Sequence, residues 1–288
     1  MRFVSLLLTA AVSSAFAQAP DVVINAELRP LIAAGDQKAS WKMYDLFRNP
    51  SLVKLQLTTE QGFVIRLANR FARYPNDRTN GLLEHAYIEM PGFWRGGYID
   101  LPFGRKNLIR EYGPGGEIKT QLLIDNADIV VAGFDNGDKK SRGVIGRLGS
   151  KVGFSFAAGN RLATGAMSLT NARDPDRAPN PDRGYRQIYG LDFGLRKGPW
   201  FGNFEGVVLR DGETDLDRDD TVFDILLGWQ SKRKGLSAGI GWTRSAREDQ
   251  DFFRFQGEYP LDDKSSLSVQ AIQGAKRNRI GIGLVIRL

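Results

Sequence analysis

Apolar and polar residues alternate with a period of two through most of this chain, and this pattern limits its fold more than any other feature. Residues 185–196 show it plainly, with Tyr189, Leu191, Phe193 and Leu195 on one face and Gly190, Asp192, Gly194 and Arg196 on the other. The alternation recurs at 63–71, 151–159, 221–230, 236–243 and 279–288. It is typical of strands with one apolar and one polar face, and no convincing amphipathic helix accompanies it. The sequence therefore predicts an all-β protein.

Residues 1–17 have the three parts of a secretory signal peptide. Arg2 supplies the positive charge, residues 3–12 form the apolar region, and Ala15-Phe16-Ala17 is a small-residue cleavage site. The apolar run is too short to cross a bilayer as a helix. We therefore expect residues 1–17 to be removed and residues 18–288 to form the exported domain.

The composition excludes several classes of protein. The 288 residues include no Cys, which rules out a disulfide scaffold, a zinc finger and a cysteine nucleophile. A mean hydropathy of −0.31 is too polar for a bundle of membrane helices. The net charge of +7 suits an anionic partner such as lipid head groups or anionic solutes. Because the chain is exported, we do not expect nucleic acid as a partner.

The lengths of the segments and of their connections indicate a barrel. Strand-like segments of roughly 9–11 residues match a tilted crossing of the bilayer. Short connections at 59–62, 91–94, 149–150, 197–199, 231–235 and 260–263 alternate with others, several of them long, such as 29–51, 102–141 and 160–184. This asymmetry is typical of transmembrane antiparallel β-barrels. We count about 14 strands with both chain ends on the short-turn side, or about 16 if residues 41–47 and 162–169 are strands as well. A secreted soluble all-β binding protein alternates in the same way and stays open as an alternative.

Residues 84–107 form a predicted hairpin followed by a long segment. Two strand-length segments, 84–90 and 95–101, flank Pro91-Gly92-Phe93-Trp94, whose Pro and Gly favour a tight reversal. The stretch resembles a motif of the general diffusion porins of Gram-negative bacteria, in which a hairpin and a Gly-Arg pair precede the loop that folds into the pore. The residues that carry this resemblance are Ala86, Tyr87, Gly92, Phe93, Gly104 and Arg105. Glu89 and residues 101–103 depart from the motif.

The resemblance implies where the pore narrows. Residues 102–141 would form an inward-folding constriction loop, with Asp125, Asp128, Asp135 and Asp138 as acidic groups at its rim. Lys54, Arg66 and Arg70 share the polar face of the early strands and would form the opposing basic pore wall. Opposed charges of this kind select among solutes. A plain solvated turn at 135–138 is the alternative, because Asp, Asn and Gly favour turns regardless of function.

The sequence thus predicts a porin, a water-filled channel of the bacterial outer membrane for passive diffusion of small hydrophilic solutes, with a modest preference for anions. Its expected partners are outer-membrane lipid, these solutes and, by resemblance, further copies of the chain in a homotrimer. No cofactor, metal or reaction is expected. The single histidine, His85, has no Ser close by in the sequence, and the acidic run 214–220 lacks the Gly and Glu of a calcium loop. A barrel enzyme and a plugged barrel with a structural or adhesive role are the alternatives.

Overall fold

The computed structural model describes residues 21–35, 38–47, 49–71, 82–105, 108, 112–121, 127–135, 142–160, 185–211, 220–231, 235–246, 249–274 and 277–288. The predicted signal peptide at residues 1–17 lies outside the described residues, as do residues 162–169. Within the described ranges the regular structure consists of strands. No helix in this part of the chain is long and apolar enough to cross a membrane.

The strands follow one another along the chain with few interruptions. They are β1 (Asp21–Leu28), β2 (Leu31–Gly35), β3 (Ser40–Lys42), β4 (Leu52–Thr58), β5 (Val64–Arg70), β6 (Leu83–Met90), β7 (Trp94–Asp100), β8 (Tyr112–Gln121), β9 (Asp128–Asp135), β10 (Arg142–Gly149), β11 (Val152–Asn160), β12 (Tyr185–Lys197), β13 (Trp200–Asp211), β14 (Asp220–Gln230), β15 (Ser237–Ser245), β16 (Gln250–Pro260), β17 (Ser265–Gly274) and β18 (Arg277–Arg287).

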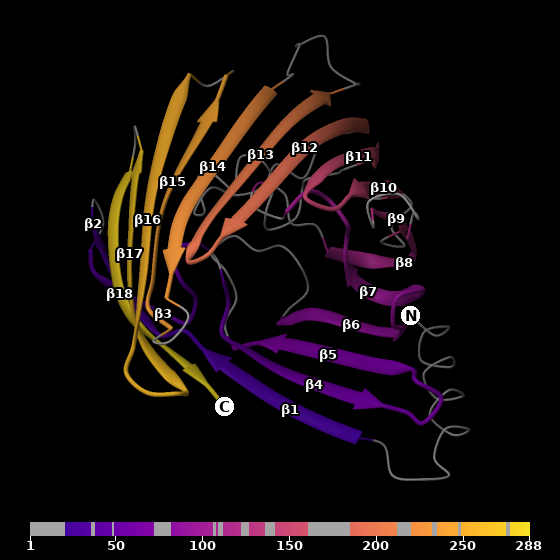
Figure 1. Cartoon of the computed structure of the whole chain (residues 1–288), viewed down its shortest axis with the longest axis horizontal. Coiled ribbons are helices and arrows are strands. Elements are labelled where there is room, and N and C mark those ends of the chain that lie inside the picture. The colour runs from indigo at the N-terminus through magenta and orange to yellow at the C-terminus, as the bar shows by residue number, and fades with distance from the viewer. Residues whose placement is uncertain are drawn as a thin grey trace.

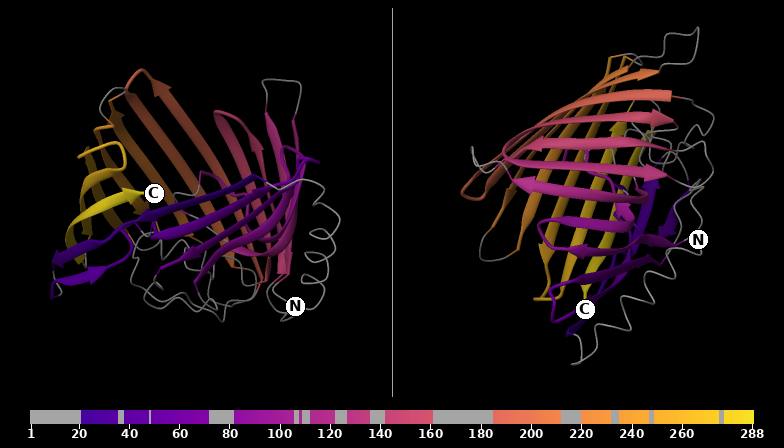
Figure 2. Two further views of the ribbon diagram at one scale, coloured as in Figure 1. Left: turned by 90° about the horizontal axis from the view of Figure 1, so that it is seen from below. Right: turned by 90° about the vertical axis from the view of Figure 1, so that its right-hand side faces the viewer.

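These strands close into one antiparallel barrel (Figure 1). β1 pairs with β4, each strand from β4 to β18 pairs with the next, and β18 returns to β1 through the pairs Glu27–Arg287 and Leu28–Ile286. β1 together with β4–β18 makes the 16-stranded ring. Figure 2 shows its strands running side by side at a tilt. Closure pairs the last strand with the first at the seam, and so satisfies backbone groups there that lipid could not hydrogen-bond.

β2 and β3 extend the seam of the barrel instead of adding to the ring. β2 continues the register of β1 along β18, with Leu31 opposite Gly283 and Gly35 opposite Arg279. β1 and β2 are thus one long strand interrupted at Pro30, whose nitrogen has no hydrogen to donate. β3 pairs with β2 beside it.

The all-β antiparallel barrel is confirmed, and the strand count is 16, the alternative value, where 14 had been preferred. The two strands missing from the preferred count are β8 and β9, which lie inside the predicted loop 102–141. The run Gly113-Pro114-Gly115-Gly116 had suggested a loop, yet β8 pairs with β7 on one side and β9 on the other. Pairing on both sides outweighs the weak local preference for a turn.

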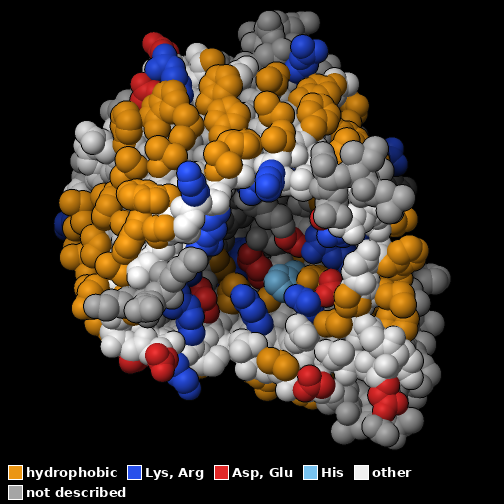
Figure 3. All heavy atoms as spheres, viewed as in Figure 1, with side chains coloured by type: hydrophobic (Ala, Val, Ile, Leu, Met, Phe, Trp, Pro, Cys, Tyr) orange, Lys and Arg blue, Asp and Glu red, His pale blue; other side chains and the backbone are white. Residues whose placement is uncertain are grey.

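The registers divide the side chains into two sets. Apolar residues such as Trp200, Leu227 and Ile240 point away from the barrel and are exposed, and Figure 3 shows an apolar band on the outside of the molecule. Polar residues such as Ser155, Asp192 and Asp224 point inward and are buried. An apolar outside and a polar inside reverse the arrangement of a soluble sandwich, and they match a wall that faces lipid.

Candidate functional site

The segment after β7 leaves the wall and folds into the barrel. Leu101, Phe103 and Leu108 are buried there with inward-facing apolar residues of β7 and of the strands from β9 to β14. The ring of Phe103 lies on Gly190 of β12, where an added Cβ would come within 2.8 Å of the ring. The Gly104 N–H donates a hydrogen bond of 2.9 Å to Ser155 Oγ on β11. Residues 101–105 and 108 therefore form an inward segment, docked on the middle of strands β11–β13.

An ion-pair cluster fixes the end of the inward segment. Arg105 Nε lies 3.1 Å from Asp192 Oδ1 on β12, and Arg105 Nη2 donates to the carbonyl of Lys151 at 2.8 Å. Arg147 of β10 donates to both oxygens of the same carboxylate, at 2.9 and 2.7 Å. One buried carboxylate therefore holds two guanidinium groups, one from the wall and one from the inward segment.

The prediction that residues 102–141 form a single constriction loop is wrong beyond the inward segment, because that range contains the two wall strands β8 and β9. Asp128 lies in the wall and pairs with Lys119 at 2.8 Å. Asp135 is opposite Arg142 on the outward face of β9. Asp125 and Asp138 lie outside the described residues. Neither of the two described rim aspartates, Asp128 and Asp135, belongs to the inward segment. The carboxylate that pairs with this segment is Asp192 of β12.

The predicted basic wall exists, but its three members differ in their surroundings. Lys54, Arg66 and Arg70 all point inward from β4 and β5, as the cross-strand registers require. Lys54 is exposed, and Arg66 is paired with Glu89 at 2.8 Å while 41% of its side chain stays exposed. Arg70 is buried in an ion pair with Glu84. Arg70 is therefore masked from the lumen, and only Lys54 and Arg66 present charge to it.

A β-bulge creates the partner of Arg70. The register of β5 against β6 shifts between Ala68 and Asn69, so that Glu84 falls at the irregular position. A bulge of this kind re-aims a side chain, and Glu84 turns inward to meet Arg70. Nothing in the period-2 pattern of the sequence signals this pair.

Ion pairs line the inside of the wall, and most of them share one arrangement. The acidic partner is buried against the wall and the longer basic partner extends toward the lumen. Asp192 is 1% exposed against 28% for Arg105, and Asp224 is 0% exposed against 14% for Arg254. The short Asp side chain stays near its strand, whereas Arg can reach into water. Consistently, Figure 3 shows a hollow in the barrel interior with Lys and Arg gathered around it.

Residues 43–47 and 49–51 form a second inward excursion, between β3 and β4. The Leu46 N–H donates a 2.8 Å hydrogen bond to Gln270 Oε1 on the inner face of β17, and Leu46 packs on Leu31 and Ile272. Asp45 accepts hydrogen bonds from the Phe47 and Asn49 N–H groups at 2.9 and 2.8 Å. The sequence predicted only a short element at 41–47. Its position inside the barrel depends on the contact with β17, which is distant in the sequence.

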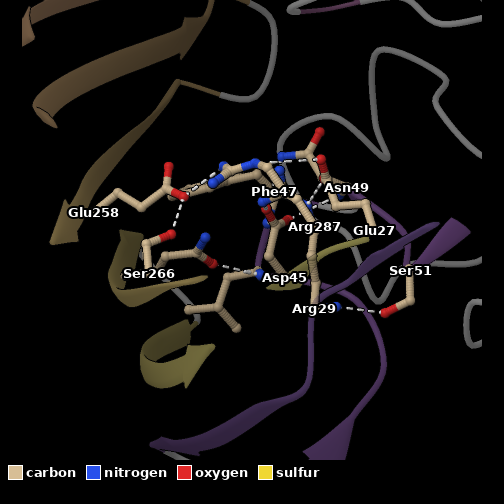
Figure 4. Close-up of polar contacts among 11 residues, drawn as sticks. Glu27, Arg29, Asp45, Phe47, Asn49, Ser51, Glu258, Ser266 and Arg287 are labelled. Atoms are coloured by element: carbon tan, nitrogen blue, oxygen red, sulfur yellow. Dashed lines mark hydrogen bonds and ion pairs between the residues drawn. The ribbon is translucent and has the colours of Figure 1, made fainter. Parts of the chain in front are cut away.

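A polar network beside this excursion closes the barrel seam (Figure 4). Arg287 of β18 donates to Glu258 of β16 at 2.7 Å, and Glu258 also accepts from Ser266 of β17 at 2.5 Å. On the β1 side of the seam, Glu27 pairs with Arg29 at 2.6 Å. Arg287 lies 3.8 Å from Glu27 and so connects the two sides. The last strand is thus tied to the first by charged side chains as well as by backbone pairing.

The hairpin motif occupies the wall beside the inward segment. Ala86 and Tyr87 lie in β6, and Tyr87 points inward under the Arg95 guanidinium, 5.4 Å from its ring centroid. Gly92 has φ +80° in the turn, and the Phe93 N–H closes that turn on the Met90 carbonyl at 3.0 Å. Gly104 and Arg105, described above, lie in the inward segment, so the motif does precede an inward-folding element.

His85 is the single histidine of the chain, and its surroundings bear on the alternative of a barrel enzyme. His85 lies beside Tyr87, with ring centroids 5.4 Å apart, and opposite Ala68. Among the described side chains it hydrogen-bonds to no Ser, and no group of three or more His, Cys, Asp or Glu in this part of the chain could hold a metal. What the site offers is a hollow with fixed charges.

No family model matches the chain, and no curated protein sequence matches it either. Several solved outer-membrane structures share its fold at low identity. OmpT of Vibrio cholerae in a trimer form is 8% identical, with a TM-score of 0.60 over 94% of this chain and 100% of that one. The outer membrane channel DcaP of Acinetobacter baumannii is 13% identical, with a TM-score of 0.63 over 94% and 98%. An anion-selective porin from Comamonas acidovorans is 9% identical, with a TM-score of 0.58 over 93% and 100%. The likeness shows the fold, that of outer-membrane barrels.

Proposed function

We propose that the chain is a porin, forming a water-filled channel in the bacterial outer membrane through which small hydrophilic solutes diffuse passively. The observation that carries this proposal is a closed barrel with an apolar outside, a polar inside and an inward segment that narrows the lumen without ending the hollow seen in Figure 3. Fixed charges around a narrowed aqueous path are how channels sort solutes.

We propose a modest preference for anions. In most of the lumen ion pairs the basic partner is the more exposed one, and the exposed Lys54 has no acidic partner among the described residues. In an ion pair, the carboxylate lies close behind the Arg guanidinium. The pair therefore acts on the lumen as a dipole and not as a full positive charge. Salt at physiological strength screens charges over about 8 Å. The preference should therefore be partial.

The location and the assembly are part of the same proposal. The structural neighbours are outer-membrane proteins and one is a trimer, which supports an outer-membrane location and a homotrimer for this chain. The exposed apolar outer face supports contact with lipid.

Planar-bilayer recording of detergent-folded protein tests the proposal. We expect stepwise, ohmic conductance in KCl and, in a salt gradient, a reversal potential of modest anion-selective sign. A plugged structural barrel would give no conductance steps. An enzyme would require a nucleophile and a base. We expect the parent and His85→Ala to hydrolyse lipid and peptide substrates no faster than a protein-free blank does. Conductance that is absent in repeated insertions would refute the channel.

A further inference from the structure

A pocket of about 720 Å³ lies where the lumen meets the short turns of β10–β11 and β12–β13. Its lining includes Arg105 at the end of the inward segment and Lys151 in the β10–β11 turn. Arg196 and Gln230 come from the ends of β12 and β14, and Phe201 and Asn203 from β13. Its volume lies within the range of about 300–1,000 Å³ in which proteins hold small ligands.

The charge of this pocket has one sign. Among the described residues, no acidic side chain lines it. Arg105 has Asp192 as partner, but Arg147 shares that carboxylate, and Asp192 is 1% exposed behind them. Lys151 and Arg196 are exposed and lack acidic partners among the described residues; Arg196 is instead oriented by a 3.0 Å hydrogen bond to Gln230 Oε1. A pocket with three cations and no accessible carboxylate attracts anions.

The pocket also has an aromatic wall. The ring of Phe201 lies against Gly228 of β14, where an added Cβ would come within 2.1 Å of the ring. Phe201 lines the pocket and remains partly exposed, so part of its ring is accessible from the lumen. Flat aromatic faces favour offset stacking with other planar groups.

We propose that this pocket binds small planar organic anions, with aromatic carboxylates as the class that fits best. The carboxylate pairs with the Arg196 guanidinium, whose planar donors match it, and Lys151 adds a second positive charge. The ring of the ligand stacks on Phe201. The transport role of this site rests on the proposed channel function, but the binding itself does not.

Binding of 4-fluorobenzoate to detergent-folded protein, followed by the fluorine NMR linewidth, tests the site without any conductance. We expect saturable broadening that benzoate reverses at lower concentrations than acetate or inorganic phosphate. Arg196→Gln and Phe201→Leu should each weaken binding about fivefold or more, as expected for loss of one exposed ion pair or one stacking contact. Lys264→Gln is the matched control, since it removes an exposed cation from a different short turn and should leave binding unchanged. Heat-modifiable migration confirms that each variant is folded.

Two results would overturn the inference. Broadening that Lys264→Gln reduces as much as Arg196→Gln would show diffuse attraction by net charge. Displacement by acetate or phosphate as effective as by benzoate would remove the role of Phe201. Binding without bilayer conductance would refute the channel and leave this site standing, whereas conductance without binding would do the reverse.

Discussion

The shared carboxylate of Asp192 allows a sharp test of how the inward segment is held. In Asp192→Asn the side chain keeps its shape but loses its charge, so Arg105 loses its ion-pair partner at 3.1 Å. A partly exposed ion pair contributes about 0.2–1 kcal/mol. Asp192 is 1% exposed and Arg105 keeps its hydrogen bond to the Lys151 carbonyl at 2.8 Å, so we take the upper end of that range, about 1 kcal/mol. The population with an undocked inward segment should then rise about fivefold.

A single thiol reports this undocking. The chain has no Cys, and Pro102 is buried in the inward segment, so Pro102→Cys gives a protected probe. When redocking is faster than modification, the labelling rate follows the undocked population. We expect labelling by a water-soluble thiol reagent about fivefold faster in the Asp192→Asn background.

The matched control is Asp224→Asn, which removes an equally buried wall carboxylate. Its partners, Arg254 at 2.6 Å and Thr243 at 2.6 Å, belong to the wall and not to the inward segment. Labelling in Asp224→Asn should therefore stay close to that of the parent. Equal acceleration in both variants would refute the specific role of Asp192, and so would an unchanged rate in Asp192→Asn.

Further predictions concern charge, the seam and one turn. Lys54→Glu with Arg66→Glu should move the reversal potential in a KCl gradient toward cations, by less at high salt. Arg70→Gln should leave that reversal potential unchanged but lower the urea midpoint of unfolding. Glu84 then stays buried without its cation, at a cost of about 3–5 kcal/mol. A change in selectivity as large as that of the double variant would contradict the masking of Arg70. Deleting residues 277–288 should abolish the heat-modifiable folded band, because β17 and β1 lose their partner. In the exposed β16–β17 turn, hydrogen bonds from Ser265 and from the Lys264 N–H hold the pKa of Asp262 below 3.8, so ionised Asp262 stabilises the fold above that pH. The advantage of the parent over Asp262→Asn in urea should disappear as the pH falls through the lowered pKa, and an advantage retained at pH 2 would contradict this assignment.

Much of the barrel could be predicted from local pattern. Residues 185–196 alternate because one face of β12 meets the outside and the other the lumen, and each side chain reports its own face. Turn residues such as Gly92 identified the hairpin for a similarly local reason, since its positive φ favours Gly. The inward direction of Lys54, Arg66 and Arg70 followed from the same period of two.

The sequence misled where local preference and pairing disagree. Pro114 and its neighbouring glycines read as a loop, but the neighbours β7 and β9 place them in a strand. A barrel that lacked β8 and β9 would still have an even number of strands, so the parity of the chain ends could not reveal the error.

The sequence by itself determined the fold class, the two faces of the wall and the charges that point inward, because these depend on neighbours only one or two residues away. Only the tertiary structure decided which charges remain available to the lumen. The partner of Arg70 comes from a bulge, the partner of Arg105 lies 87 positions along the chain at Asp192, and Leu46 finds Gln270 224 positions away. Closing a ring of strands brings such residues together, and these contacts depend on the course of the inward segments and on many strand pairings at once, which the alternation within one strand does not specify.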